Sequence, residues 1–91
     1  MIISEKINGT KILVEIESSN LKEAEYDTEN KTLIMTFKNA RKYQYEDVPW
    51  ETFTKFRMSE SQGKFFNSEI RKFPFKEIKE EKENDTTPNN Q

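Results

Sequence analysis

Apolar and polar residues alternate along the first part of the chain, with the period of two that is typical of half-buried strands. The first two strands form a predicted hairpin, in which Ile2-Ile3 and Ile12–Ile16 flank Asn8-Gly9. Asn-Gly readily supplies the positive φ angles of a type I′ turn, so we place the turn at this dipeptide. Ser18-Ser19-Asn20 then interrupts the alternation with residues that favour turns.

The same alternation predicts three more strands, over Lys22–Tyr26, Thr32–Lys38 and Arg41–Glu46. Ala24 and Tyr26 should point inward from the first of these strands. Leu33, Met35 and Phe37 share one face of the second strand, and the third strand carries Tyr43 and Tyr45. Short strands joined by short polar turns predict an antiparallel meander.

The period changes to that of a helix after Pro49. Trp50, Phe53 and Phe56 recur at helical spacing, which predicts a helix that lies across one face of the sheet. Pro49 suits the first helical turn, and Asp47 is expected to accept backbone N–H groups at its start.

A second short helix is predicted near Lys64–Arg71, where Phe66 and Ile70 are four residues apart and can touch. Phe73-Pro74-Phe75 should be extended, because a proline disfavours the helical conformation in the residue before it. The predicted fold class is therefore α+β. We expect a small antiparallel meander sheet of about 4–5 strands, packed by one or two short helices from the C-terminal half.

The end of the chain has a different composition. From residue 79 it reads KEEKENDTTPNNQ, which contains no apolar residue and cannot bury enough surface to offset the entropy of ordering. We expect a single domain over residues 1–78 and an acidic disordered tail over residues 79–91, whose simplest role is to aid solubility.

The composition argues against several classes of protein. The chain has 91 residues, which suits one small domain, and it contains no cysteine and no histidine. Disulfides, the usual zinc ligands and the side chain best suited to proton transfer at neutral pH are therefore missing. The serines have no histidine to activate them, and no pair of acids has a spacing that implies a shared pocket. We expect a non-catalytic protein without a cofactor or a metal.

The sequence also bears on location. No apolar run approaches the roughly 20 residues needed to cross a bilayer. The N-terminus, MIISEKINGT, lacks the basic segment and the cleavage site of a signal peptide. We expect a cytoplasmic protein with no membrane partner.

The strand that carries Tyr43 and Tyr45 is one candidate binding site. Two tyrosines one residue apart share a face of the strand, and Arg41 and Lys42 precede them. Their rings either fill the core beneath the helix or offer surfaces on which bases stack. The apolar face of the neighbouring strand also needs cover, which favours the core, but both interpretations stay open.

Residues 62–76, QGKFFNSEIRKFPFK, form a second candidate site. They combine four phenylalanines and a glycine with four cations, which are Lys64, Arg71, Lys72 and Lys76. Phosphates bind Lys and Arg, and unstacked bases bind rings, so this composition is typical of a nucleic-acid contact. Alternatively, the phenylalanines anchor the segment to the core and the cations are ordinary surface charges.

Five short motifs in order resemble the KTSC domain, a small module named for its occurrence at the C-terminus of certain lysyl-tRNA synthetases. The motifs are Ser18-Ser19-Asn20, Glu25-Tyr26-Asp27, Leu33 to Phe37, Tyr43-x-Tyr45-x-x-Val48-Pro49, and Ser61-x-Gly63-x-Phe65-Phe66-Asn67-x-x-Ile70-Arg71. The resemblance covers about residues 14–75. The module also occurs alone in bacterial and phage proteins, and RNA binding has been suggested for it. Residues 1–12, the acidic tail and Asn39-Ala40, where the family usually has a glycine, depart from the family pattern.

Three hypotheses for function follow. The first is a non-catalytic module that binds RNA or single-stranded nucleic acid through aromatic and basic residues, which are Arg41, Lys42, Tyr43, Tyr45, Lys64, Arg71, Lys72 and Lys76. The second is a small phage-type inhibitor or adaptor that binds a host protein through its acidic tail or a surface patch. The third is a domain with a pocket for a small nucleotide. Either a monomer or a dimer is compatible with the sequence, because the N-terminal hairpin presents a possible free edge.

Overall fold

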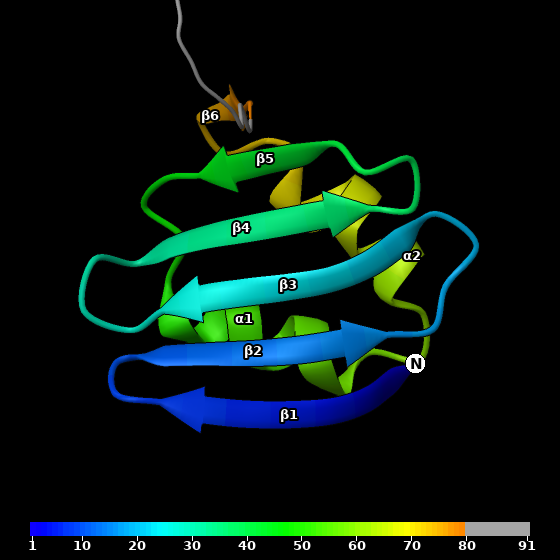
Figure 1. Cartoon of the computed structure of the whole chain (residues 1–91), viewed down its shortest axis with the longest axis horizontal. Coiled ribbons are helices and arrows are strands. Elements are labelled where there is room, and N and C mark those ends of the chain that lie inside the picture. The colour runs from blue at the N-terminus through cyan, green and yellow to red at the C-terminus, as the bar shows by residue number, and fades with distance from the viewer. Residues whose placement is uncertain (80–91) are drawn as a thin grey trace, which may run out of the picture.

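The computed structural model describes residues 1–79 and shows one sheet with helices on one side (Figure 1). The elements in chain order are β1 (Ile2–Asn8), β2 (Lys11–Ile16), β3 (Leu21–Asp27), β4 (Thr32–Phe37), β5 (Lys42–Tyr45), α1 (Trp50–Met58), α2 (Gln62–Phe65), the π-helical turn η1 (Phe66–Ile70) and β6 (Phe75–Ile78). No helix within this part of the chain is long and apolar enough to cross a membrane. The predicted acidic tail, apart from Lys79, lies outside the described residues.

The sheet is a six-stranded antiparallel meander in which each strand pairs with the next one in the sequence. The predicted α+β fold class is thus confirmed. The sixth strand, β6, was expected only as an extended segment after Pro74, and it pairs with β5 so that Phe75 lies opposite Tyr45. Pro74 lies just before the strand, where its missing N–H group removes no ladder hydrogen bond.

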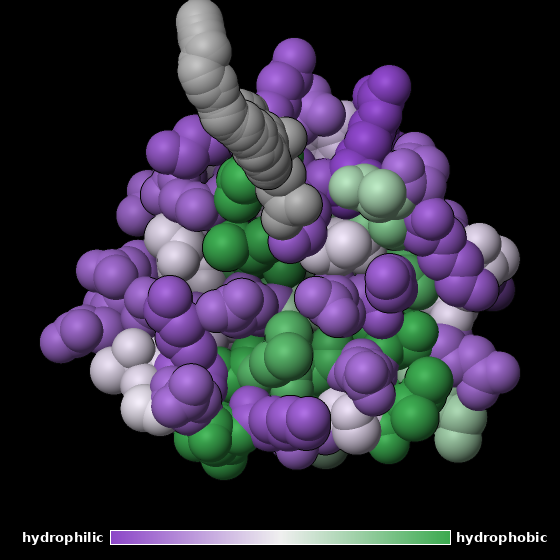
Figure 2. Space-filling model, viewed as in Figure 1, coloured by the Kyte–Doolittle hydropathy of each residue, from purple (hydrophilic) through white to green (hydrophobic). Residues whose placement is uncertain are grey.

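The helices cover one face of the sheet, and the core lies between them (Figure 1). Most of the alternate apolar residues of the strands are buried and pack against the apolar side of the helices, whereas Phe37 and Tyr43 pack against this core but stay partly exposed. The fully buried members are Val14, Leu21, Ala24, Tyr26, Leu33, Met35, Val48, Phe53, Phe56 and Ile70. The other face, which we call the open face, carries mostly hydrophilic side chains with some apolar ones between them (Figure 2).

The first hairpin forms as expected, but its turn is one residue later than predicted. The strands end at Asn8 and restart at Lys11, so Gly9 and Thr10 are the central residues of the turn. Gly9 has a φ of 65°, whereas Thr10 has no positive φ. A positive φ at the first central residue alone is the pattern of a type II′ turn, which favours glycine at that position.

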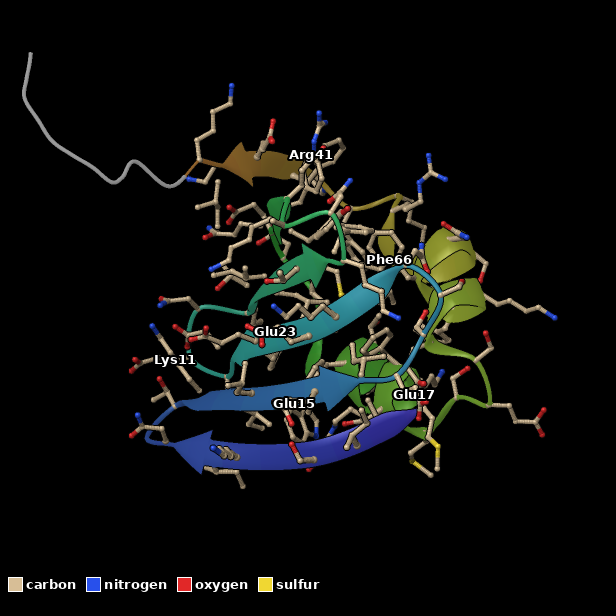
Figure 3. The ribbon with its side chains drawn as sticks, turned by 45° about the vertical axis from the view of Figure 1, so that its right-hand side comes forward. Lys11, Glu15, Glu17, Glu23, Arg41 and Phe66 are labelled. Atoms are coloured by element: carbon tan, nitrogen blue, oxygen red, sulfur yellow. The ribbon has the colours of Figure 1, made fainter. Side chains whose placement is uncertain are left out.

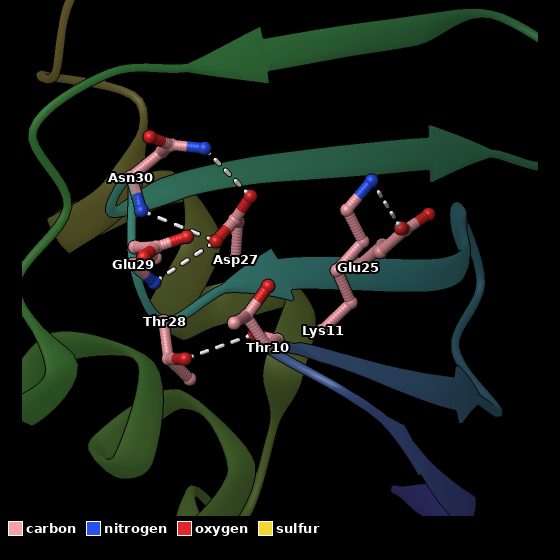
Figure 4. Close-up of polar contacts among 7 residues, drawn as sticks. All are labelled: Thr10, Lys11, Glu25, Asp27, Thr28, Glu29 and Asn30. Carbon is pink, nitrogen blue, oxygen red and sulfur yellow. Dashed lines mark hydrogen bonds and ion pairs between the residues drawn. The ribbon is translucent and has the colours of Figure 1, made fainter.

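Asp27 closes the turn between β3 and β4 (Figure 4). Its Oδ1 accepts hydrogen bonds from the backbone N–H groups of Glu29 at 2.9 Å and Asn30 at 3.1 Å, and its Oδ2 accepts one from Asn30 Nδ2 at 2.9 Å. These bonds, above all the one from the Asn30 backbone, hold the pKa of Asp27 below its usual value.

The start of α1 is held by the sheet rather than by a side-chain cap. Pro49 is the N-cap residue and no side chain of residues 1–79 caps the helix, so the predicted role of Asp47 was wrong. Asp47 instead adopts a positive φ of 57° in the turn before the helix. The backbone of Val48 is fixed on both sides: its N–H donates to Lys31 O at 2.9 Å, and its carbonyl accepts from Tyr26 Oη at 2.6 Å.

The second helical segment begins two residues earlier than predicted and ends as the π-helical turn η1. The Ser61 side chain accepts a hydrogen bond from Lys64 N and caps α2. Phe66 and Ile70, the pair predicted to touch, are both buried. The buried Gln62 amide donates to the carbonyls of Phe56 at 3.1 Å and Ser59 at 2.9 Å, which joins α2 to the end of α1.

Candidate ligand-binding pocket

A surface pocket of about 320 Å³ lies where the helical segment α2–η1 meets β5 and β6. It is lined by Asn20, Phe37, Tyr43, Tyr45, Phe66, Asn67, Arg71 and Phe75. The two candidate segments from the sequence therefore meet here, because Tyr43 and Tyr45 come from one and Asn67 and Arg71 from the other. We call this feature the aromatic pocket.

The two tyrosines differ in how much of each ring remains accessible. Tyr45 is only 4 % exposed, and its ring lies between Phe66 at 5.5 Å and Phe75 at 5.4 Å between centroids. A base could stack on Tyr45 only by displacing one of these rings, so the core interpretation is correct for this residue. Tyr43 is half-buried and makes edge contacts with Phe37 and Phe75, each at 5.7 Å. The accessible rings of the pocket are therefore Phe75, which is 56 % exposed, and the partly buried Tyr43 and Phe37.

Two arginines flank the aromatic pocket. Burial raises the pKa of the Tyr45 phenol, while the positive charge of Arg71 opposes that shift, so the Arg71 guanidinium acts on the Tyr45 hydroxyl. A hydrogen bond to the Tyr43 side chain, supported by the charges of Tyr43 and Glu77, raises the pKa of Arg41. Within residues 1–79, the Arg71 side chain makes no hydrogen bond or ion pair, so its donors are available to an anionic ligand.

The side chains of Asn20 and Asn67 line the same pocket and carry amide groups that can bind a ligand. Ser18 Oγ donates to Asn20 Oδ1 at 3.1 Å, which orients the Asn20 amide and leaves its Nδ2 without a partner among the described residues. The Asn67 side chain makes no hydrogen bond to that part of the chain either. Gly63 allows this approach of loop and helix, because a Cβ atom there would lie 3.3 Å from Asn20 Oδ1 and 3.5 Å from Ser18 Oγ.

Two further hollows adjoin the aromatic pocket. One, of about 420 Å³, shares Asn20 and Asn67 with it and extends to Lys64. The other, of about 240 Å³, shares Asn20 and Phe37 and extends to Lys38. Glu17 and Glu60 line the first of these hollows and offset the charge of Lys64, whereas no acidic side chain lines the aromatic pocket with Arg71 or the second hollow with Lys38.

The predicted site residues fall into three groups. Arg41, Tyr43, Tyr45 and Arg71 lie at the aromatic pocket, and Lys64 lies in an adjoining hollow. Figure 3 shows Arg41 beside β6, at one edge of the sheet. Lys42 and Lys76 project from the open face instead, because Lys42 alternates with Tyr43 along β5 and Lys76 is paired with Gln44.

The remaining cation, Lys72, is exposed and contacts Glu69 at 3.3 Å. The eight predicted residues therefore do not form one surface. The sequence argument treated neighbouring cations as one patch, although residues next to each other on a strand point to opposite faces. It also left out Asn20 and Asn67 as site residues, because an isolated asparagine has no distinguishing pattern; both stand within the motifs quoted for the family resemblance.

Comparison with known proteins places this architecture in a family. The family model of the KTSC domain matches residues 17–73. The crystal structure of a KTSC domain protein from Yersinia pestis is similar, with a TM-score of 0.72 and 30 % sequence identity over 76 % of this chain and 99 % of that chain. A search of curated proteins found no match. The matched range contains most of the aromatic pocket but not β1, β2 or β6.

Proposed function

Because this chain belongs to the KTSC domain family, we propose that it is a non-catalytic module that binds single-stranded nucleic acid, RNA above all, in the aromatic pocket. One observation supports this more than any other: the Arg71 and Asn67 side chains and the Asn20 Nδ2 have no hydrogen-bond partner within residues 1–79, and they line one pocket together with accessible rings. Single-stranded nucleic acids offer the matching groups, which are phosphates, base edges and base faces.

Each part of the pocket has a complementary role in this proposal. A base that enters the pocket contacts Phe75 and Tyr43, and contacts of this kind contribute about 1–3 kcal/mol per base. The amides of Asn20 and Asn67 donate to and accept from the base edge. Arg41 and Arg71 bind the phosphates on either side of that base. Duplexes are disfavoured, because their bases are stacked and cannot enter a pocket without being flipped out.

Titration of the protein with fluorescently labelled single-stranded RNA at several salt concentrations tests the proposal. Two phosphate contacts predict that the logarithm of the binding constant falls with the logarithm of salt concentration with a slope of about −1.4, since each phosphate of a single strand contributes roughly 0.7. The variant Arg71→Gln should bind more weakly and lose about 0.7 from that slope. The matched control is Lys72→Gln, the next residue along the chain, whose amine already contacts Glu69. It should change both quantities much less.

Other results would contradict the proposal. Absence of binding even at low salt would remove it, because phosphate contacts strengthen as salt falls. Equal losses from Arg71→Gln and Lys72→Gln would show diffuse attraction rather than binding in the pocket. Mononucleotides that bind as tightly as the oligonucleotide would support a pocket for a small nucleotide instead.

Removal of residues 80–91 separates this proposal from a role as an acidic inhibitor of a host protein. Those residues contain four acids and one lysine. Their loss should leave nucleic-acid binding intact or make it tighter, because nearby negative charge is removed, whereas a protein contact made by the acids would weaken.

A further inference from the structure

β1 is a free edge of the sheet. It is seven residues long and stands at one end of the strand order, so its outer side faces no other strand of residues 1–79. In Figure 1 it lies at the edge opposite β6, and therefore far from the aromatic pocket. An edge of this kind has a row of backbone donors and acceptors that a further strand can use.

Two isoleucines of β1 are exposed although they belong to the helix-covered side of the strand. Ile7 is paired with the buried Ile12, and Glu5 is paired with the buried Val14, so Ile7 and Glu5 lie on the helix-covered side. A bulge between Ile2 and Ser4 lets Ile2 pack against the core, while Ile3 remains 61 % exposed and Ile7 74 % exposed. Ile3 is the extra residue of this bulge and has no partner on β2; counted back from the paired Ser4 and Glu5, it has the same phase as Glu5.

We propose that β1 pairs with β1 of a second copy of this chain, antiparallel, about a twofold axis that passes through Glu5. The segment Ile3-Ser4-Glu5-Lys6-Ile7 has the same order of apolar and polar residues from either end, which is the property that a twofold interface requires. In this register Ile3 lies opposite Ile7 of the second copy, twice per dimer, and opposite residues in antiparallel strands share a face.

The adjacent symmetric registers fit less well. An axis through Ser4 places Glu5 opposite Ile3 of the second copy, and an axis through Lys6 places Glu5 opposite Ile7 and the two lysines opposite each other. Both arrangements oppose a charge to an isoleucine. The register centred on Glu5 is therefore the one of these three in which both exposed isoleucines face isoleucines.

The two Glu5 side chains that meet at the axis are already neutralised. Each carboxylate accepts a hydrogen bond from Arg57 of α1 at 3.2 Å, so the pair brings two ion pairs together rather than two bare charges. Lys6, on the open face, lies opposite the hydroxyl of Ser4 of the second copy. A two-strand contact is smaller than the roughly 1,200 Å² of a standard stable interface, so the dimer should form only at high protein concentration.

Single-cysteine variants test the register, because the natural chain contains no cysteine. Opposite residues in antiparallel strands have Cα atoms about 4.5–5.5 Å apart, which is within the range that a disulfide spans. Glu5→Cys should therefore form a disulfide dimer under mild oxidation. Ile3→Cys alone and Ile7→Cys alone should not, since each is four residues out of register with its own copy, but a mixture of the two should cross-link to each other.

Sedimentation equilibrium of the full chain at rising concentration measures the association without any cross-link. The natural chain should approach the dimer mass. Ile7→Lys should raise the dimer dissociation constant about tenfold or more, because it places a charge opposite Ile3 of the second copy, twice per dimer. Phe75→Lys, an equally drastic change at the opposite edge strand, should leave dimerisation unchanged. A chain that stays monomeric at millimolar concentration, equal effects of the two lysine variants, or a mixture that cross-links no faster than its single components would overturn the proposal. Its outcome is independent of nucleic-acid binding, because the aromatic pocket lies at the other edge.

Discussion

The hydrogen bond from Tyr26 to the backbone of Val48 joins the centre of the sheet to the start of α1. Tyr26 Oη donates to Val48 O at 2.6 Å, and neither residue is exposed to solvent. The substitution Tyr26→Phe removes only the hydroxyl. The ring that stacks on Phe53, with centroids 4.6 Å apart, keeps its shape and its place.

The expected cost follows from the carbonyl that is left behind. A hydrogen bond between buried groups contributes about 0.5–1.5 kcal/mol net, but a buried acceptor that loses its only donor costs about 1–3 kcal/mol. Because water cannot reach Val48 O without moving the helix, we expect Tyr26→Phe to lower the free energy of unfolding by roughly 2 kcal/mol. For a domain of this size that corresponds to a fall in Tm of about 8–16 °C.

Urea unfolding followed by tryptophan fluorescence measures this change. Trp50 is the only tryptophan, and its ring centroid lies 6.0 Å from that of Tyr26, so its fluorescence reports on the contact between the sheet and the start of α1. Tyr43→Phe is the matched control, since it also removes one phenol hydroxyl, but from a half-buried ring; it should change stability by less than about 0.5 kcal/mol. Equal stabilities of the natural chain and Tyr26→Phe would refute the view that this bond anchors the helix.

Three further predictions concern single residues. Ala40 adopts a φ of 74°, a conformation that costs an L-residue about 1–2 kcal/mol, so Ala40→Gly should raise stability in urea by about 1 kcal/mol after the extra chain entropy of glycine is counted. Burial raises the pKa of Tyr45 in the folded state, so the phenol of the unfolded chain ionises first as pH rises. The free energy of unfolding should therefore stay level below about pH 10 and fall above it. Tyr45→Phe should lose less stability at alkaline pH than the natural chain in unfolding experiments. In Gly63→Ala, the new Cβ atom crowds the Asn20 side chain, but alanine also raises the helix propensity by up to about 1 kcal/mol. The free energy of unfolding should therefore change little, while RNA affinity falls because Asn20 is displaced. Unchanged affinity would show that Asn20 does not contact the ligand.

The meander could be predicted from the sequence because each of its strands has a clear apolar face. Leu33 and Met35 are fully buried on the side that the alternation indicates. β6 could not be predicted as a strand, because three of its four residues are exposed and no alternation marks a short edge strand. The predicted cap of α1 was wrong because it rested on residue type alone. Aspartate is a common N-cap residue, but the turn between β5 and α1 holds Asp47 in a conformation with a positive φ.

The residues of the aromatic pocket were only partly predictable, because residues that are close in space can be far apart in sequence. Tyr43 and Arg71 were predicted and are brought together by the pairing of β5 with β4 and the packing of η1 on the core. Asn20 comes from the loop between β2 and β3, and no local pattern connects it to Asn67. Lys76 was assigned to the same site from its neighbours in sequence, yet the pleat of β6 places it on the open face.

The net charge of −2 does not oppose a nucleic-acid contact at the aromatic pocket, because charges act over short distances in salt solution. At physiological ionic strength the Debye length is about 8 Å. Glu15 and Glu23 are paired with each other on β2 and β3 and lie on the open face, so the sheet and its core separate them from the pocket (Figure 3). A low net charge does remove long-range attraction, which provides most of the affinity of strongly basic proteins for any nucleic acid. Affinity at this site would then come mainly from rings and amides, and these groups contact exposed bases rather than the backbone that duplexes and single strands share.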